Sequence, residues 1–136
     1  MDDLMRKNTK ELRRLTSEDA ATWLIEQYPD ETSEYGQAIT LLSHRSWKKV
    51  DQLRLARYYL KNIPFASSKP YEVFASVMSL SNLLKVIQEY WPKKEKDCNL
   101  LLYHLKPVLT NKIKSATDKE IVNQFLSSTI KGVRPD

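Results

Sequence analysis

The placement of proline is the feature that most restricts what this chain can fold into. Six prolines punctuate segments in which apolar residues recur at spacings of three and four, which is the period of an amphipathic helix. Because proline is poorly tolerated inside a helix, these residues indicate helix ends, first turns or kinks. Only two glycines occur, and β-branched residues never alternate with polar ones over the length of a strand. The predicted fold class is therefore all-α.

Capping residues and prolines locate the predicted helices of the N-terminal half. Thr16, followed by Asp19, is the expected N-cap of a first helix that ends before Pro29. Ser33 is the expected N-cap of a second helix, which runs through Leu42. A third helix is predicted from about Trp47 to Ile63.

The C-terminal half is predicted to hold three further helices. A long one starts at Pro70, ends by Pro92 and can be interrupted at the run SLS. Asp97 is the expected N-cap of the next, which Pro107 kinks or breaks, and Thr117 with Glu120 has capping-box spacing for the last. No strict period links these units, so a compact bundle of about six helices is favoured over a regular solenoid.

The first fifteen residues form an amphipathic basic segment ahead of this bundle. Leu4, Met5, Leu12 and Leu15 fall within about 100° of one another on a helical wheel, opposite a set of cations. One interpretation is an arm for a membrane surface or a nucleic acid; the commoner one is a terminal helix that docks on the bundle. The expected organisation is thus residues 1–15 as this segment, 16–130 as a single helical domain and 131–136 as a tail. The cations are Arg6, Lys7, Lys10, Arg13 and Arg14.

Charge is distributed unevenly along the chain. The net charge is +5, yet residues 1–34 hold five Lys or Arg against nine Asp or Glu. No Lys or Arg occurs between Arg14 and Arg45, whereas six occur from Arg45 to Lys61 beside one acid, Asp51. Two surfaces of opposite sign are therefore expected, and either can steer a charged partner.

No recognisable catalytic motif is present. The sequence has no glycine-rich phosphate loop, no HExxH, no CxxC and no GxSxG. On one helix Cys98 and His104 would point about 240° apart, so they cannot form a nucleophile and base within it. We expect no catalytic residue, no metal and no cofactor, and hence no enzyme. With a single cysteine, no secretory signal and no apolar run near the roughly 20 residues of a bilayer span, a cytoplasmic location and no membrane partner are expected.

The run HRSWKKVDQLRLARYY, residues 44–59, offers the alternative of a nucleic-acid surface. As a helix from Val50, it places Arg54, Arg57 and Lys61 within about 60° of one another and turns the aliphatic residues inward. A weak helix-turn-helix outline results, although a solvated cationic face is the commoner explanation of such a stripe. The residues of this alternative basic surface are Trp47, Lys48, Lys49, Arg54, Arg57 and Lys61.

A longer run that includes these residues is similar to a known family. The segment SHRSWKKVDQLRLARYYLKNIPFASSKPYEVFASVMSL, residues 43–80, resembles part of the all-helical immunity proteins of contact-dependent growth inhibition systems, in particular those that guard against EndoU-type ribonuclease toxins. The resemblance implies a cytoplasmic, non-catalytic inhibitor that binds the nuclease domain of a protein toxin and blocks RNA cleavage.

The residues themselves add a physical expectation about where such a partner would bind. Nuclease domains present cationic surfaces to RNA, so the stretch without Lys or Arg is the predicted docking surface, its acids raise the association rate, and two tyrosines are its expected anchors. The predicted partner-binding residues are Glu18, Asp19, Glu26, Tyr28, Asp30, Glu31, Glu34 and Tyr35.

Overall fold

The all-α prediction is confirmed. The computed structural model describes residues 3–30 and 35–133, with side chains as far as Thr129, and these ranges contain helices and no strand. The described helices number eight, more than the expected six and an N-terminal one. They are α1 (Asp3–Arg14), α2 (Ser17–Gln27), α3 (Tyr35–Leu42), α4 (Lys49–Leu60), α5 (Lys69–Val77), α6 (Leu80–Glu89), α7 (Glu95–Lys112) and α8 (Ala116–Val133).

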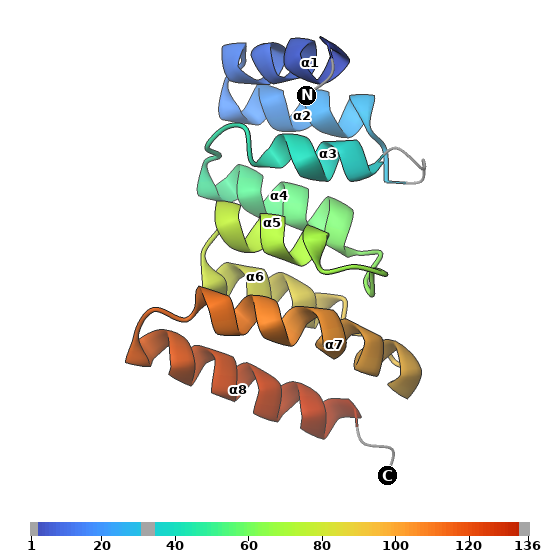
Figure 1. Ribbon diagram of the computed structural model, residues 1–136, viewed down its shortest axis with the longest axis vertical. Coiled ribbons are helices and arrows are strands. Elements are labelled where there is room, and N and C mark those ends of the chain that lie inside the picture. The colour runs from blue at the N-terminus through green and yellow to red at the C-terminus, as the bar shows by residue number, and fades with distance from the viewer. Residues whose placement is uncertain (1–2, 31–34, 134–136) are drawn as a thin grey trace.

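The helices pack as a two-layer stack. Each helix contacts the next but one in the chain, so α1, α3, α5 and α7 form one layer and α2, α4, α6 and α8 the other. Figure 1 shows this stack running from α1 at one end to α8 at the other. The arrangement differs from the compact bundle predicted from the sequence, because the pairing of helices two apart extends the molecule along one axis.

Several predicted helix boundaries are confirmed, and two of them are fixed by side-chain caps. Thr16 is the N-cap of α2, and its hydroxyl oxygen accepts the backbone N–H of Asp19 at 3.1 Å. The long helix expected after Pro70 is interrupted at SLS, where Ser79 takes an extended backbone and caps α6 by accepting the N–H of Asn82 at 3.2 Å. These caps satisfy backbone donors that have no partner within the helix.

Other predicted caps are wrong or lie outside the described residues. The N-cap of α7 is Lys94, which leaves Asp97 inside the first turn, and the helix continues through Pro107 to Lys112. At α8 the hydroxyl of Ser115 accepts the N–H of Asp118 at 3.1 Å, so this pair takes the place expected of Thr117 and Glu120. Ser33 lies outside the described residues.

Large aromatic residues fill the core between the two layers. Tyr59, Tyr71 and Phe74 are fully buried. The Tyr59 hydroxyl donates to the carbonyl of Tyr28 at 2.8 Å, and the Tyr71 hydroxyl oxygen accepts the N–H of Phe65 at 3.0 Å. Burial raises the pKa of Tyr71 to about 12 and raises the pKa of Tyr59 further, because a phenolate loses its hydration there.

The first and last helices both belong to the stack. α1 packs on α2 and α3; its Leu12 is fully buried, and the side chain of Asn8 donates to the Tyr28 hydroxyl at 2.7 Å. α8 extends to Val133, past the boundary expected at residue 130. Among the described helices, none combines the length and the apolar character that crossing a bilayer requires.

Candidate interaction surface

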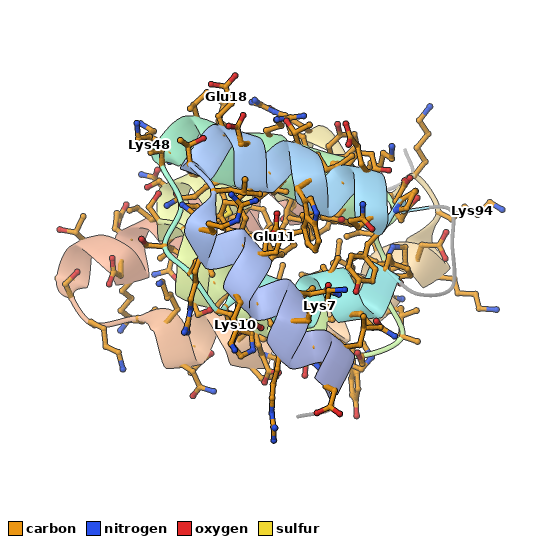
Figure 2. All side chains as sticks on the ribbon, turned by 90° about the horizontal axis from the view of Figure 1, so that it is seen from above. Lys7, Lys10, Glu11, Glu18, Lys48 and Lys94 are labelled. Carbon is orange, nitrogen blue, oxygen red and sulfur yellow. The ribbon has the colours of Figure 1, made fainter. Side chains whose placement is uncertain are left out.

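The outward side of α2 carries a group of carboxylates, which we call the acidic face. Its members are Glu18, Asp19 and Glu26, all exposed, while the opposite side of the helix buries Ala20, Ala21 and Leu24. The helical period turns Glu18 and Glu26 to the same side, with Thr22 between them. Figure 2 shows Glu18 projecting outward from α2. Within the described part of the chain, none of the three carboxylates takes part in an ion pair.

Asp30, which was predicted to bind a partner, forms its contacts within the molecule. Its carboxylate forms an ion pair with Lys61 at 3.1 Å and accepts the Asn62 side-chain amide at 3.0 Å, while its backbone N–H donates to Tyr58. Desolvation opposes ionisation of Asp30, but the hydrogen bonds from Asn62 and Lys61 outweigh it and lower the pKa of the carboxyl. Asp30 therefore joins the end of α2 to the end of α4. Glu31 and Glu34 lie outside the described residues.

The two tyrosines proposed as anchors lie in different environments. Tyr28 is only 5% exposed, and its hydroxyl oxygen accepts from Asn8. Its side chain belongs to the core, so it is not exposed for a partner to contact. Tyr35 is half-buried, with its ring centroid 6.0 Å from that of Phe65, and it remains part of the surface.

The cations of α4 are engaged by neighbouring helices. Arg54 donates to the Thr22 hydroxyl on α2 at 2.8 Å. Arg57 makes two hydrogen bonds to the carboxylate of Glu89 on α6, at 2.9 and 3.1 Å, and the bond from Arg57 lowers the pKa of that carboxyl. Lys61 is held by Asp30. Arg54 and Lys61 are exposed, as the predicted stripe requires, but all three cations also contact neighbouring parts of the even-numbered layer.

Trp47, the aromatic member of the alternative basic surface, is also in the core. It is 6% exposed, its indole N–H donates to the carbonyl of Leu42 at 2.9 Å, and the guanidinium of Arg45 lies 4.8 Å from its ring centroid. A buried ring covered by a cation cannot stack on a nucleic-acid base. Lys48 and Lys49 are exposed at the start of α4.

Four of the exposed lysines lie on separate parts of the molecule. Lys7 and Lys10 lie on α1, Lys48 at the start of α4 and Lys94 before α7. Figure 2 shows Lys48 and Lys94 at separate edges of the molecule, away from the lysines of α1. A nucleic-acid surface generally concentrates its cations along one groove or stripe, and these four residues do not do so.

Arg45 has a structural role that its sequence context did not indicate. One guanidinium nitrogen donates to the carbonyls of Leu12 and Leu15, at 2.7 and 2.8 Å, where α1 ends. In return Arg13 of α1 donates to the carbonyl of His44 at 2.9 Å. The first cation after the acidic stretch therefore fastens α1 to the α3–α4 connection. No sequence signal identifies its acceptors, because they are backbone atoms about thirty positions away.

Asp51, the lone acid of the basic run, is buried. It is 3% exposed and accepts the hydroxyl of Ser17 at 2.6 Å. Ser17 in turn accepts the N–H of Lys48 at 2.9 Å, so the N-termini of α2 and α4 meet at this pair. Acids are favoured in the first turn of a helix. This preference is consistent with the place of Asp51 in α4, but it does not predict that the side chain is buried.

Cys98 and His104, the two groups considered for catalysis, both lie on α7. Burial raises the pKa of the Cys98 thiol, whose Sγ donates to the carbonyl of Pro92 at 3.1 Å, so the reactive thiolate is disfavoured. His104 packs its ring against Tyr103. Over the residues that the structure describes, no three His, Cys, Asp or Glu side chains come together as metal ligands would.

Comparison of the chain with protein-family models, with curated proteins and with solved structures finds no match.

Proposed function

We propose that this protein is a non-catalytic interaction protein that binds and neutralises a ribonuclease toxin, as the resemblance of residues 43–80 to contact-dependent inhibition immunity proteins implies. The observation that carries the proposal is the acidic face of α2. Its three exposed carboxylates have no ion-pair partner among the described residues. A cationic RNA-binding surface is complementary to such a face.

The charges of the neighbouring helix support this choice of surface. Arg54 lies against Thr22, in the middle of the acidic face, yet the carboxylates of Glu18 and Glu26 are not within ion-pair distance of it. Arg57 and Lys61 are neutralised by Glu89 and Asp30. The three carboxylates of α2 are therefore not paired with the cations of the α4 stripe, and their negative charge would act mainly on the rate of encounter.

The alternative, a nucleic-acid-binding regulator, has less support from the same contacts. It needs Trp47 for stacking and Arg54, Arg57 and Lys61 for phosphate contacts, but the first is buried and the others are engaged within the fold. Its test is a titration with duplex and single-stranded RNA or DNA at low salt. Binding that weakens steeply as salt increases would favour the regulator over the inhibitor.

The proposal predicts a toxin gene beside this one, and it is tested by mixing the chain with the ribonuclease domain of that toxin. We expect a stable complex and suppressed RNA cleavage. The triple variant Glu18→Lys, Asp19→Lys, Glu26→Lys should associate at least about 10-fold more slowly at low ionic strength, with a smaller change in dissociation rate. Stopped-flow association at several salt concentrations measures this.

The matched control changes the same net charge elsewhere. Glu72, Glu95 and Glu120 are exposed on α5, α7 and α8, and reversing all three should slow association far less than reversing the acidic face. Equal slowing by the two triple variants, or full inhibition with an unchanged association rate, would remove α2 as the docking surface. Absence of any complex would remove the inhibitor function.

A further inference from the structure

The opposite layer of the stack carries a groove between α3 and α5. Its volume is about 410 Å³, within the range of sites that bind small molecules or side chains. The two helices contact each other in the odd-numbered layer, away from the acidic face of α2. The residues that line the groove include Tyr35, Gly36, Ile39, Ser67, Lys69 and Pro70.

The described residues do not account for a glycine at position 36 in this groove. It lies in the first turn of α3, and its φ is not positive, so the backbone does not demand glycine. A Cβ built there would meet no atom within 4 Å beyond its immediate surroundings on α3, so packing does not demand it either. Glycine weakens a helix relative to alanine. A glycine at this position allows another molecule to approach the backbone closely.

The groove has an apolar floor and a cationic rim. Ile39 and Pro70 are buried beneath it and Tyr35 is half-buried beside it. Among the described residues that line it, Lys69 is the only charged one. The Lys69 ammonium donates to the hydroxyl of Thr40 at 2.9 Å, and Thr40 donates to the carbonyl of Gly36 at 3.2 Å. A neutral hydroxyl thus holds the cation at the groove, and no carboxylate among the described residues compensates its charge.

From these contacts we propose that the α3–α5 groove binds a short segment of a partner protein in which a carboxylate adjoins an aliphatic side chain. The apolar side chain would cover Ile39 and Pro70, and the carboxylate would accept from Lys69 and the Ser67 hydroxyl. The chain segment would pass over Gly36, where a side chain would obstruct it. A charge-assisted hydrogen bond combined with apolar burial gives such a site both orientation and affinity.

The test uses three blocked pentapeptides and the full isotope-labelled chain. The probe is acetyl-Gly-Leu-Asp-Leu-Gly-amide; one control peptide replaces Asp by Asn, and the other replaces both Leu by Ala. We expect the probe to cause saturable NMR shifts at Tyr35, Ile39 and Lys69 at millimolar concentrations, and both controls to bind at least about 5-fold more weakly. No saturable shift at these residues up to about 5 mM probe, or equal binding of all three peptides, overturns the proposal.

Two variants locate the binding on the protein. Gly36→Leu fills the groove from a position with open space, and Lys69→Gln removes its charge; each should weaken probe binding at least about 5-fold. Asn123→Leu and Lys119→Gln, at exposed positions of α8, make the same kinds of change elsewhere and should leave it unchanged. Circular dichroism verifies that all four variants fold. Loss of binding in the α8 variants but not in the groove variants would place the site elsewhere.

This site is independent of the proposed toxin-binding function. The acidic face lies on α2, in the other layer, so the Gly36→Leu variant should retain toxin binding through α2. Failure of the peptide experiment would leave the inhibitor proposal unchanged, and failure of the inhibitor proposal would leave the groove testable with the same peptides.

Discussion

Raising the pH above about 10 should destabilise the folded chain steeply, because two tyrosines are buried as neutral phenols. Burial raises the pKa of Tyr71 to about 12 and raises that of Tyr59 further, whereas both should titrate near 10 in the unfolded chain. Between these values the folded state holds protons that the unfolded state has lost. The stabilising contribution is complete below pH 10 and is lost as the pH rises through the folded-state pKa values.

The magnitude follows from the linkage between protonation and folding. Each tyrosine should remove about 1 kcal/mol from the free energy of unfolding between about pH 10 and about pH 11, where the unfolded-state phenols pass from half to nearly full ionisation, so the pair should remove roughly 2 kcal/mol over that unit. Urea unfolding at a series of pH values, with tyrosinate absorbance recorded in parallel, measures both quantities.

Tyrosine variants separate this effect from general alkaline damage. Tyr71→Phe should reduce the pH slope by about half, at a cost near neutral pH of roughly 1 to 3 kcal/mol, because the N–H of Phe65 loses its acceptor. Tyr103 is 75% exposed, so Tyr103→Phe should leave the slope unchanged. The same slope in Tyr71→Phe as in the unmodified chain would show that this residue does not control alkaline stability.

The sequence predicts local features of this fold well. The spacing of apolar residues and the prolines define the helices, and Thr16 caps α2 as expected. Each of these features depends on residues within a few positions of one another. The wrong caps are errors of the same short range: Lys94 and Ser115 stand two or three positions from Asp97 and Thr117, and each lies in a polar run that offers several candidate caps.

Which helices become neighbours depends on contacts that no local pattern contains. A helical wheel groups Arg54, Arg57 and Lys61 correctly. It does not show that these cations bind Thr22, Glu89 and Asp30. The first two of these partners stand thirty-two positions from the arginines that they bind. The wheel predicts that the cations share one side of α4; it cannot predict that α2 and α6 supply acceptors there.

The same limit applies to the candidate binding residues. Glu18, Asp19 and Glu26 are exposed as a surface role requires, because they follow the helical period opposite buried alanines and Leu24. Tyr28 ends the same helix but is buried, since α1 covers it and donates to its hydroxyl through Asn8. Its burial depends on how α1 docks, which the amphipathic pattern of residues 1–15 leaves undetermined.

The docking of α1 rests on Arg45, so Arg45→Ala should be among the most destabilising single changes outside the core. The substitution removes donors to the carbonyls of Leu12 and Leu15 and a cation that lies over the ring of Trp47. Hydrogen bonds to charged donors contribute about 1.5 to 3 kcal/mol, and a cation–π contact adds about 0.5 to 1 kcal/mol. We expect a loss of roughly 2 to 4 kcal/mol in urea unfolding.

Hydrogen exchange distinguishes loss of the Arg45 contacts from general destabilisation of the fold. In Arg45→Ala the amides of α1 should exchange faster than those of α6. Of these two helices, only α1 loses a hydrogen-bond donor to the carbonyls at its C-terminal end. Arg45→Lys should recover less than half of the loss, since one ammonium lacks the planar fork that serves the carbonyls and the indole together. Arg54→Ala, which removes a single exposed bond to Thr22, is the matched control and should have a much smaller effect. If Arg45→Lys were as stable as the unmodified chain, a positive charge alone would suffice to hold α1 in place.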